Sequence, residues 1–369
     1  MDIRLIIAGL TIAFLLALAV SAVLGAAARP LARRIGFLDR PDLERKQGRP
    51  AVPYGGGAAM LLAFVAALAA LWLVRRAALG GRPDLLEGLL PRFDAIGPGE
   101  LRRFAFIGAG GLLVFAMGLL DDARRIPPLA KFIVQILAAL LLVYAGVRVT
   151  ANIPSYPVSV LLTVLWVVGI TNAFNLLDNM DGLSAGTAAI AAFIFAMVAG
   201  STGQPALAAV LAVLAGAAAG FLVHNFCPAR LYMGDAGSYW LGYTLSALTV
   251  EATFYRPGDS SPAMLALGVP LLIMAVPIFD TSSVLWIRLR AGRPLWVGDR
   301  SHLSHRLLGM GLSVREAVLA VWLLTLACGL GALCLKELPV HLGVLVLVQA
   351  AAILAVVAIL EGLGRRKEH

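Results

Sequence analysis

Long apolar runs recur along the whole chain and are separated by short polar segments. Most have close to the roughly 20 residues that a helix needs to cross a bilayer, and their Leu, Ala, Val and Gly content favours helices over barrel strands. The pattern predicts an all-α integral membrane protein, with one polytopic domain over residues 1–369 and about eleven transmembrane helices. The expected ranges are 5–28, 56–79, 104–120, 128–147, 157–174, 184–200, 206–226, 237–253, 262–287, 314–335 and 339–363.

Composition supports a membrane protein over a soluble one. Hydrophobic residues make up 60% of the chain and charged residues only 14%, whereas a soluble domain carries about a quarter charged residues. The range 5–28 is longer than the apolar region of a signal peptide, so it is expected to remain as the first span. The three cysteines are scattered and have neither the spacing of a zinc site nor that of a disulfide framework.

The basic residues predict the orientation in the membrane. The net charge is +9, and most of the 30 lysines and arginines lie in alternate polar segments such as 29–54 and 288–315. Positive residues gather on the cytoplasmic side, so these segments are expected there, with the N-terminus outside and the C-terminus cytoplasmic. The segment 75–103 is an exception, because it carries arginines on the opposite side. This distribution makes nucleic-acid binding an unnecessary explanation of the charge.

Four polar motifs all fall on the predicted cytoplasmic side. The first ends the third span with Asp121 and Asp122, followed by Arg124 and Arg125. Adjacent carboxylates at a membrane boundary repel each other and are costly to desolvate. Either the arginines neutralise them at the headgroups, or the pair binds a metal or takes a proton. Lys131, one turn into the next helix, could meet a phosphate or extend to the interface.

The second and third motifs add amides and further acids. Asn172, Asn175 and Asp178 recur at every third residue at the end of the fifth span, and Asp181 follows in a turn. These residue types weaken a helix, which indicates another role. In the third motif, Asn225 precedes Asp235, which glycines flank before a helix expected to start near Ser238. Asp235 either caps that helix or faces an anion and its metal.

The fourth motif contains His302 and His305, flanked by Arg300 and Arg306. Imidazole and guanidinium groups beside a lipid surface suit phosphate binding, although anionic headgroups alone could explain a basic loop. Together the motifs bring acids, amides and basic groups to one face of a helical bundle. Because Mg²⁺ prefers carboxylate and phosphate oxygens, a magnesium–diphosphate substrate would balance the acids.

These four motifs, in this order, resemble those of the polyprenyl-phosphate N-acetylhexosamine-1-phosphate transferases, the glycosyltransferase 4 family. The likeness extends over nearly the whole chain and includes Lys46 beside Arg45 and the Gly55–Gly56 pair of the first loop. Departures are Arg125 where a third acid is common, Gly48 and Ser304 where histidines are common, and Asn179 in place of a glycine. The histidine loop is more similar to the undecaprenyl-phosphate GlcNAc-1-phosphate transferase branch than to phospho-N-acetylmuramoyl-pentapeptide transferase.

The resemblance implies transfer of a sugar 1-phosphate, by default GlcNAc-1-phosphate, from a UDP-sugar to undecaprenyl phosphate with release of UMP. It also implies Mg²⁺ or Mn²⁺, a site on the cytoplasmic face of the inner membrane, a homodimer as a possible assembly, and a role in making a cell-envelope polysaccharide such as O-antigen or teichoic acid. The expected roles are catalysis by Asp121, Asp122 and Asp178, with metal binding by Asp235 and Asp121. The expected substrate-binding residues are Asn172, Asn175, Asp181, Asn225, Lys131, His302, His305, Arg306 and Lys46.

Two other functions fit parts of the pattern. A transporter or flippase would also carry intramembrane polar residues, but its acids should lie at mid-span or on both faces. The muramoyl-pentapeptide transferase of peptidoglycan synthesis shares most of the motifs, and its usual run of histidines is absent here. A carboxylate of the Asp121–Asp122 pair could attack directly and form a covalent intermediate, or it could only position and deprotonate the lipid phosphate.

Overall fold

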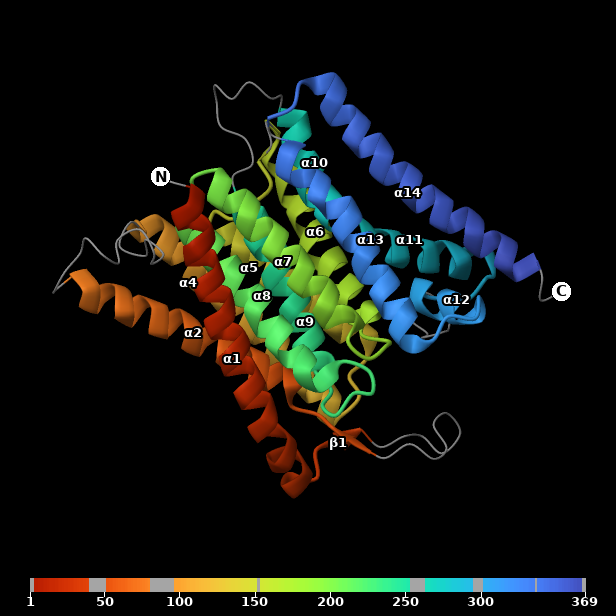
Figure 1. The fold of residues 1–369 in the computed structure, drawn as a ribbon, viewed down its shortest axis with the longest axis horizontal. Coiled ribbons are helices and arrows are strands. Elements are labelled where there is room, and N and C mark those ends of the chain that lie inside the picture. The colour runs from red at the N-terminus through yellow and green to blue at the C-terminus, as the bar shows by residue number, and fades with distance from the viewer. Residues whose placement is uncertain are drawn as a thin grey trace.

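The structure is a computed structural model, and it describes residues 3–39, 51–79, 96–150, 153–252, 263–294, 301–335 and 337–366. Within these ranges it is helical apart from one short antiparallel strand pair (Figure 1). The elements are α1 (Ile3–Ile35), β1 (Leu38–Asp39), β2 (Val52–Pro53), α2 (Gly56–Leu79), α4 (Pro98–Ala123), α5 (Pro128–Tyr144), α6 (Tyr156–Leu177), α7 (Leu183–Ser201), α8 (Pro205–Asn225), α9 (Gly234–Glu251), α10 (Ala263–Ile273), α11 (Ala275–Arg290), α12 (Leu303–Gly309), α13 (Val314–Leu335) and α14 (Val340–Arg366).

The expected apolar ranges all coincide with helices, and eight of these helices are long and apolar enough to cross a membrane. The eight are α1, α2, α4, α6, α7, α8, α13 and α14, and α10 with α11 could make a ninth. Helix α5 has only 17 residues, and α9 is too polar to be among them. The structure therefore confirms a helical, multi-pass membrane protein, while the count of eleven spans and the orientation of the termini stay predictions.

The predicted helix over 262–287 is two helices. It breaks at Met274, and the two parts meet at an angle of 73°. Pro277 explains the break, because a proline has no N–H to donate to the carbonyl four residues earlier and its ring clashes with that carbonyl. The expected start of α9 near Ser238 is also corrected, because the helix begins one turn earlier at Gly234.

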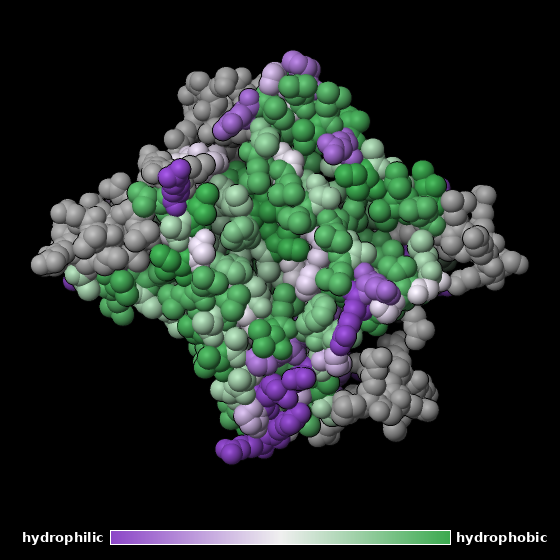
Figure 2. All heavy atoms as spheres, in the orientation of Figure 1, coloured by the Kyte–Doolittle hydropathy of each residue, from purple (hydrophilic) through white to green (hydrophobic). Residues whose placement is uncertain are grey.

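The outer surface of the bundle is apolar. Leucines such as Leu62, Leu113, Leu161 and Leu345 are more than one third exposed. Figure 2 shows apolar residues across the middle of one face and hydrophilic residues mainly towards its upper and lower edges. A soluble protein rarely exposes an apolar surface of this extent, whereas lipid would cover it.

Helix α9 lies at the centre of the bundle, where other helices shield it from lipid. Its residues from Ala236 to Thr249 are buried, including serines and threonines. These hydroxyls have partners: the Thr249 Oγ1 accepts a hydrogen bond from the Trp166 Nε1 at 3.0 Å, and the Ser246 Oγ donates to the Tyr243 carbonyl at 2.8 Å. Protein contacts thus replace water around α9, which explains how so polar a helix can sit among apolar ones.

Glycines let α4 and α2 approach the start of α9 closely. A Cβ added to Gly118 in α4 would lie 2.5 Å from the backbone N of Ala236 and 2.5 Å from the carbonyl O of Asp235. A Cβ added to Gly57 in α2 would lie 2.5 Å from the Cα of Gly237. The obstacles are backbone atoms, so a larger residue would have to move α9 itself. Small residues at such crossings are typical of membrane helix packing.

We expect Gly118→Ala to destabilise the protein by about 1–3 kcal/mol, because the new methyl group overlaps the α9 backbone. The measurement is thermal unfolding of the detergent-solubilised protein. Gly108→Ala is the matched control, since it lies in the same helix and its added Cβ would meet nothing within 4 Å. The control should be neutral or slightly stabilising, because alanine favours a helix. Equal unfolding temperatures for both variants would contradict the close-packing account.

Candidate active site

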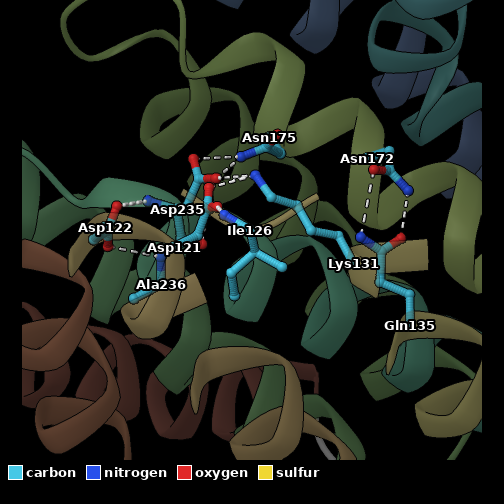
Figure 3. Close-up of polar contacts among 10 residues, drawn as sticks. Asp121, Asp122, Ile126, Lys131, Gln135, Asn172, Asn175, Asp235 and Ala236 are labelled. Carbon is cyan, nitrogen blue, oxygen red and sulfur yellow. Dashed lines mark hydrogen bonds and ion pairs between the residues drawn. The ribbon is translucent and has the colours of Figure 1, made fainter. Parts of the chain in front are cut away.

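The third motif meets the first at one end of the bundle, where α4, α5, α6 and α9 converge (Figure 3). The Lys131 ammonium of α5 lies between two carboxylates: it donates to the Asp121 Oδ2 and, at 3.0 Å, to the Asp235 Oδ2. The Asn175 Nδ2 of α6 donates to the Asp235 Oδ1 at 3.0 Å. Four residues that the sequence singled out from four separate helices therefore form one connected cluster.

Asp122 has a different environment from its neighbour. Its Oδ1 accepts the backbone N–H of Asp235 at 2.7 Å, and its Oδ2 accepts that of Ala236 at 3.1 Å. Asp122 thus caps the N-terminus of α9 from a separate helix, satisfying two N–H groups that have no partner within α9. Gly234, with φ of 71°, makes room for it, since a Cβ there would lie 2.4 Å from the Asp122 Oδ2.

Asp121 is held by its own loop as well as by Lys131. Its Oδ1 accepts the backbone N–H of Ile126 at 2.6 Å. This contact folds the segment between α4 and α5 back onto the end of α4. Both carboxylates of the pair are therefore fixed in place, but only Asp121 faces the cation.

Asn172 lies apart from the carboxylates and pairs with a residue that sequence reasoning missed. The Asn172 Nδ2 donates to the Gln135 Oε1, and the Gln135 Nε2 donates back to the Asn172 Oδ1 at 3.4 Å. Figure 3 shows this amide pair on the far side of the Lys131 side chain from Asp122. Gln135 is 1% exposed, and its neighbours in α5 from Phe132 to Val143 are apolar. That isolated amide was the signal that could have identified it.

Asp181 and Asn225 hold the turns around the site. The Asn225 Oδ1 accepts the Gly182 N–H at 2.9 Å, and its Nδ2 donates to the Leu231 carbonyl at 3.0 Å. The Asp181 Oδ2 accepts the Ala229 N–H at 2.9 Å. Through these contacts the turn after α6 is tied to the loop between α8 and α9, which leads into Asp235.

Asp178 follows the last residue of α6 and accepts no hydrogen bond from any residue that the structure describes. Partial burial and then the nearby carboxylates, that of Asp235 foremost, raise the pKa of Asp178 well above its usual range. A carboxyl group with spare acceptor capacity at such a place is suited to bind a ligand.

The histidine motif forms a short helix that packs on the same turn. The Ser304 Oγ of α12 donates a hydrogen bond to the Asn179 Oδ1 at 2.7 Å. Because Asn179 follows Asp178, this hydrogen bond joins α12 to the Asp178 turn. The His302 Nδ1 is 2.8 Å from the Asp280 Oδ2, and the Arg306 Nη2 donates to the Ser283 Oγ at 2.8 Å. Sequence reasoning placed Asp280 inside a span and missed it. His305 lies in the same short helix. Lys46 lies outside the described residues.

The oxygen donors fit a hard cation such as Mg²⁺. Asp121 and Asp235 both contact the Lys131 ammonium, and the Asn175 amide also donates a hydrogen bond to Asp235. In the described part of the chain, no three His, Cys, Asp or Glu side chains surround a common point as a preformed metal site. Asp121 and Asp235 are the residues that would hold such a cation.

The arrangement suits the binding and activation of phosphate groups at a membrane surface. A fixed ammonium and several carboxylates lie at the end of apolar helices, where charge is costly unless paired. Phosphoryl transfer depends mainly on alignment and charge stabilisation, which such a set of groups can supply.

A family pattern matches the central part of the chain, and individual known proteins match most of its length. The pattern of glycosyl transferase family 4 matches residues 104–253, which contain the first three motifs. A Bacillus subtilis protein named "Probable undecaprenyl-phosphate N-acetylglucosaminyl 1-phosphate transferase" is 29% identical over 97% of this chain and 94% of its own. The decaprenyl-phosphate N-acetylglucosaminephosphotransferase of Mycobacterium tuberculosis H37Rv is 31% identical over 80% of this chain and 74% of its own. The undecaprenyl-phosphate alpha-N-acetylglucosaminyl 1-phosphate transferase of Escherichia coli K12 is 33% identical over 27% of this chain and 25% of its own.

The fold and the site define a multi-pass membrane protein whose polar cluster is suited to bind phosphate groups. The chain belongs to glycosyl transferase family 4, the polyprenyl-phosphate N-acetylhexosamine-1-phosphate transferases, as its motifs and these relatives show. The relatives' names also support the GlcNAc-1-phosphate branch over the muramoyl-pentapeptide branch.

Asp122 provides a test of the capping geometry. We expect Asp122→Ala, which loses both accepted hydrogen bonds, to lower the free energy of unfolding by about 1–2 kcal/mol. Asp122→Asn should fall between this variant and the wild type, because its one carbonyl oxygen can still accept. Asp235→Asn is the control: it removes a carboxylate from the same cluster but leaves the α9 cap intact. If Asp122→Ala unfolds in detergent at the wild-type temperature, the cap does not stabilise the fold.

Proposed function

We propose that this protein transfers N-acetylglucosamine 1-phosphate from UDP-N-acetylglucosamine to undecaprenyl phosphate. An oxygen of the lipid phosphate attacks the phosphorus that carries the sugar, and the bond from that phosphorus to the bridging oxygen breaks. The products are undecaprenyl diphosphate N-acetylglucosamine and UMP. The observation that carries the proposal is the Asp121–Lys131–Asp235 cluster at the end of apolar helices, in a chain whose relatives are named for this reaction.

Lys131 is proposed to meet the phosphate oxygens. Its ammonium is already fixed between two carboxylates, so it needs little reorganisation when a phosphate approaches. Asp121 is proposed to position or deprotonate the lipid phosphate, since it lies at the end of α4 in contact with that ammonium. Asp122 supports this pair by fixing the start of α9.

A divalent cation, Mg²⁺ or Mn²⁺, is proposed to bind with the donor's diphosphate. Asp235 and Asp121 would hold it, and when bound it would neutralise charge on the diphosphate. Asn175 orients Asp235 for this role through its hydrogen bond to the Oδ1. We also propose that the site faces the cytoplasm across the inner membrane, as the distribution of basic residues predicts. The envelope polysaccharide that uses the product and a homodimeric assembly stay predictions.

The remaining motif residues are proposed to bind the donor. Asp178 has spare acceptor capacity, and the turn that carries it is held by Asp181 and Asn225. Asn172 is oriented by Gln135 beside the cluster. His302, His305 and Arg306 are proposed to contact the diphosphate or the sugar from the α12 side, and Lys46 to add a positive charge from the first loop.

The reaction itself is tested by UMP release from detergent-purified protein. We expect release to require undecaprenyl phosphate, a divalent cation and UDP-N-acetylglucosamine, and to stop when EDTA removes the cation. Asp121→Asn and Asp235→Asn should each lower the rate by at least about 100-fold, the range for losing a positioned acid–base or charge-stabilising group. Full metal-dependent activity in Asp235→Asn would rule out the metal assignment. A panel of other UDP-sugars identifies the donor if this one gives no UMP.

Lys131→Gln tests the role of the fixed ammonium. We expect it to lower kcat/KM by about 100-fold or more, because the two carboxylates lose their shared cation and the phosphate loses a donor. Arg124→Gln is the matched control: it removes the same charge from the same end of the bundle, but its side chain is exposed. The control should stay within about threefold of wild type. Comparable losses in both variants would indicate a general surface-charge effect.

A further inference from the structure

Asp280 is a buried acid that none of the roles above uses. It lies in α11, shortly after the break at Met274, and it is 1% exposed. Burying a carboxylate among apolar helices is costly unless hydrogen bonds compensate for the lost water. Its contacts therefore indicate what the acid is for.

Asp280 contacts the start of α12 with both oxygens. The Oδ1 accepts the backbone N–H of Leu303 at 2.6 Å, and the Oδ2 lies 2.8 Å from the His302 Nδ1. The Arg306 Nη2 is 3.8 Å from the Oδ1. Ser283 completes the arrangement, because its Oγ donates to the Asp280 carbonyl at 2.9 Å and accepts from Arg306. One acid thus caps the helix and fixes the ring of its N-cap histidine.

This pairing assigns separate roles to the two ring nitrogens. A carboxylate only accepts, so the Nδ1 carries a proton and donates it to Asp280. The Nε2 forms no hydrogen bond with any described residue, so it is the nitrogen left for a ligand. A ring that carries a proton on both nitrogens donates its Nε2–H to an anion in a charge-assisted hydrogen bond.

The position of α12 places His302 beside the turn that carries Asp178. Leu303, the residue after His302, is buried in one cluster with Leu177 and Met180, which flank Asp178. Ser304 bonds to Asn179 on the same turn. Two departures from the family pattern, Ser304 and Asn179, therefore contact each other and dock α12 onto the Asp178 turn.

We propose that Asp280 is a positioning residue for His302: it holds the Nδ1–H and leaves the Nε2 to bind the diphosphate of the nucleotide-sugar donor. The inference rests on the proposed function, because it assumes that donor. Asp280 does not touch the substrate itself. It acts through His302, as an outer carboxylate orients a histidine ligand in a metal site.

The test is equilibrium binding of UDP-N-acetylglucosamine, with Mg²⁺, to detergent-purified full-length protein. Asp280→Asn should weaken binding about tenfold, because an amide holds the Nδ1–H less firmly than a carboxylate and the Nε2 hydrogen bond to the donor is misaligned. In turnover assays the loss should appear in KM for the donor, with kcat within about threefold of wild type. In the His302→Ala background, Asp280→Asn should have no further effect on binding, since the ring it orients is gone.

Thr281→Val is the matched control for disturbing α11 at this depth. Its Oγ1 is buried and has no hydrogen-bond partner among the described residues, so the substitution should leave donor binding and kcat unchanged. If Asp280→Asn does not unfold cooperatively as a monodisperse protein, Asp280→Glu replaces it. That variant keeps the charge but moves the carboxylate by one methylene, and donor binding should again weaken.

Three results would overturn the inference. Wild-type donor affinity in a folded Asp280→Asn variant is one, and an equal added loss in the His302→Ala background is another, because it would show a purely structural role. A loss confined to kcat is the third. Failure of the proposed function gives a different result: the wild type itself would neither bind UDP-N-acetylglucosamine nor release UMP.

Discussion

Repulsion among carboxylates is the constraint that shapes this end of the molecule. Asp121, Asp122, Asp178 and Asp235 lie near one another at the boundary of an apolar bundle, where water screens their charges poorly. Three features offset the repulsion. The Lys131 ammonium lies between two of the acids, the N-terminus of α9 faces a third, and the Asn175 amide donates to Asp235. A phosphate substrate with its cation would therefore meet charged groups that are already held in fixed positions.

The compensation depends on where α9 begins. The positive end of its helix dipole and its first free N–H groups point at Asp122, so a shift of α9 by even one residue would uncouple them. Close glycine contacts from α2 and α4 fix that position, and the surrounding helices bury α9 on all sides. The polar composition of α9 therefore reflects its place inside the bundle. A rigid helix at the centre supplies the precision that a site for charge stabilisation requires.

The sequence predicted the helices and the gathering of the motifs, because lipid imposes a simple rule on length and composition. Apolar runs had to be helices, and the alternation of the expected spans assigned the four polar motifs to one boundary of the bilayer. The partners within the site could not be read in the same way. Nothing in the spacing of Asp122 distinguishes it from Asp121, yet one caps a helix and the other faces Lys131. Gln135 and Asp280 were missed because each lies inside an expected span and away from the polar motifs at the helix ends, although a buried polar group within a span is itself a functional signal.

The polar residues of the site divide into two groups by their hydrogen bonds. Asp122, Asp181 and Asn225 use their oxygens on backbone N–H groups, and so they define the framework. Asp178 has no such partner among the described residues, and the partners of Asp235 are side chains that a ligand can draw away. Removing a framework residue should therefore disturb stability first, whereas removing a residue of the second group should disturb binding or rate with little effect on the fold. The motifs of this chain mix both groups, so motif membership alone does not indicate which residues touch the substrate.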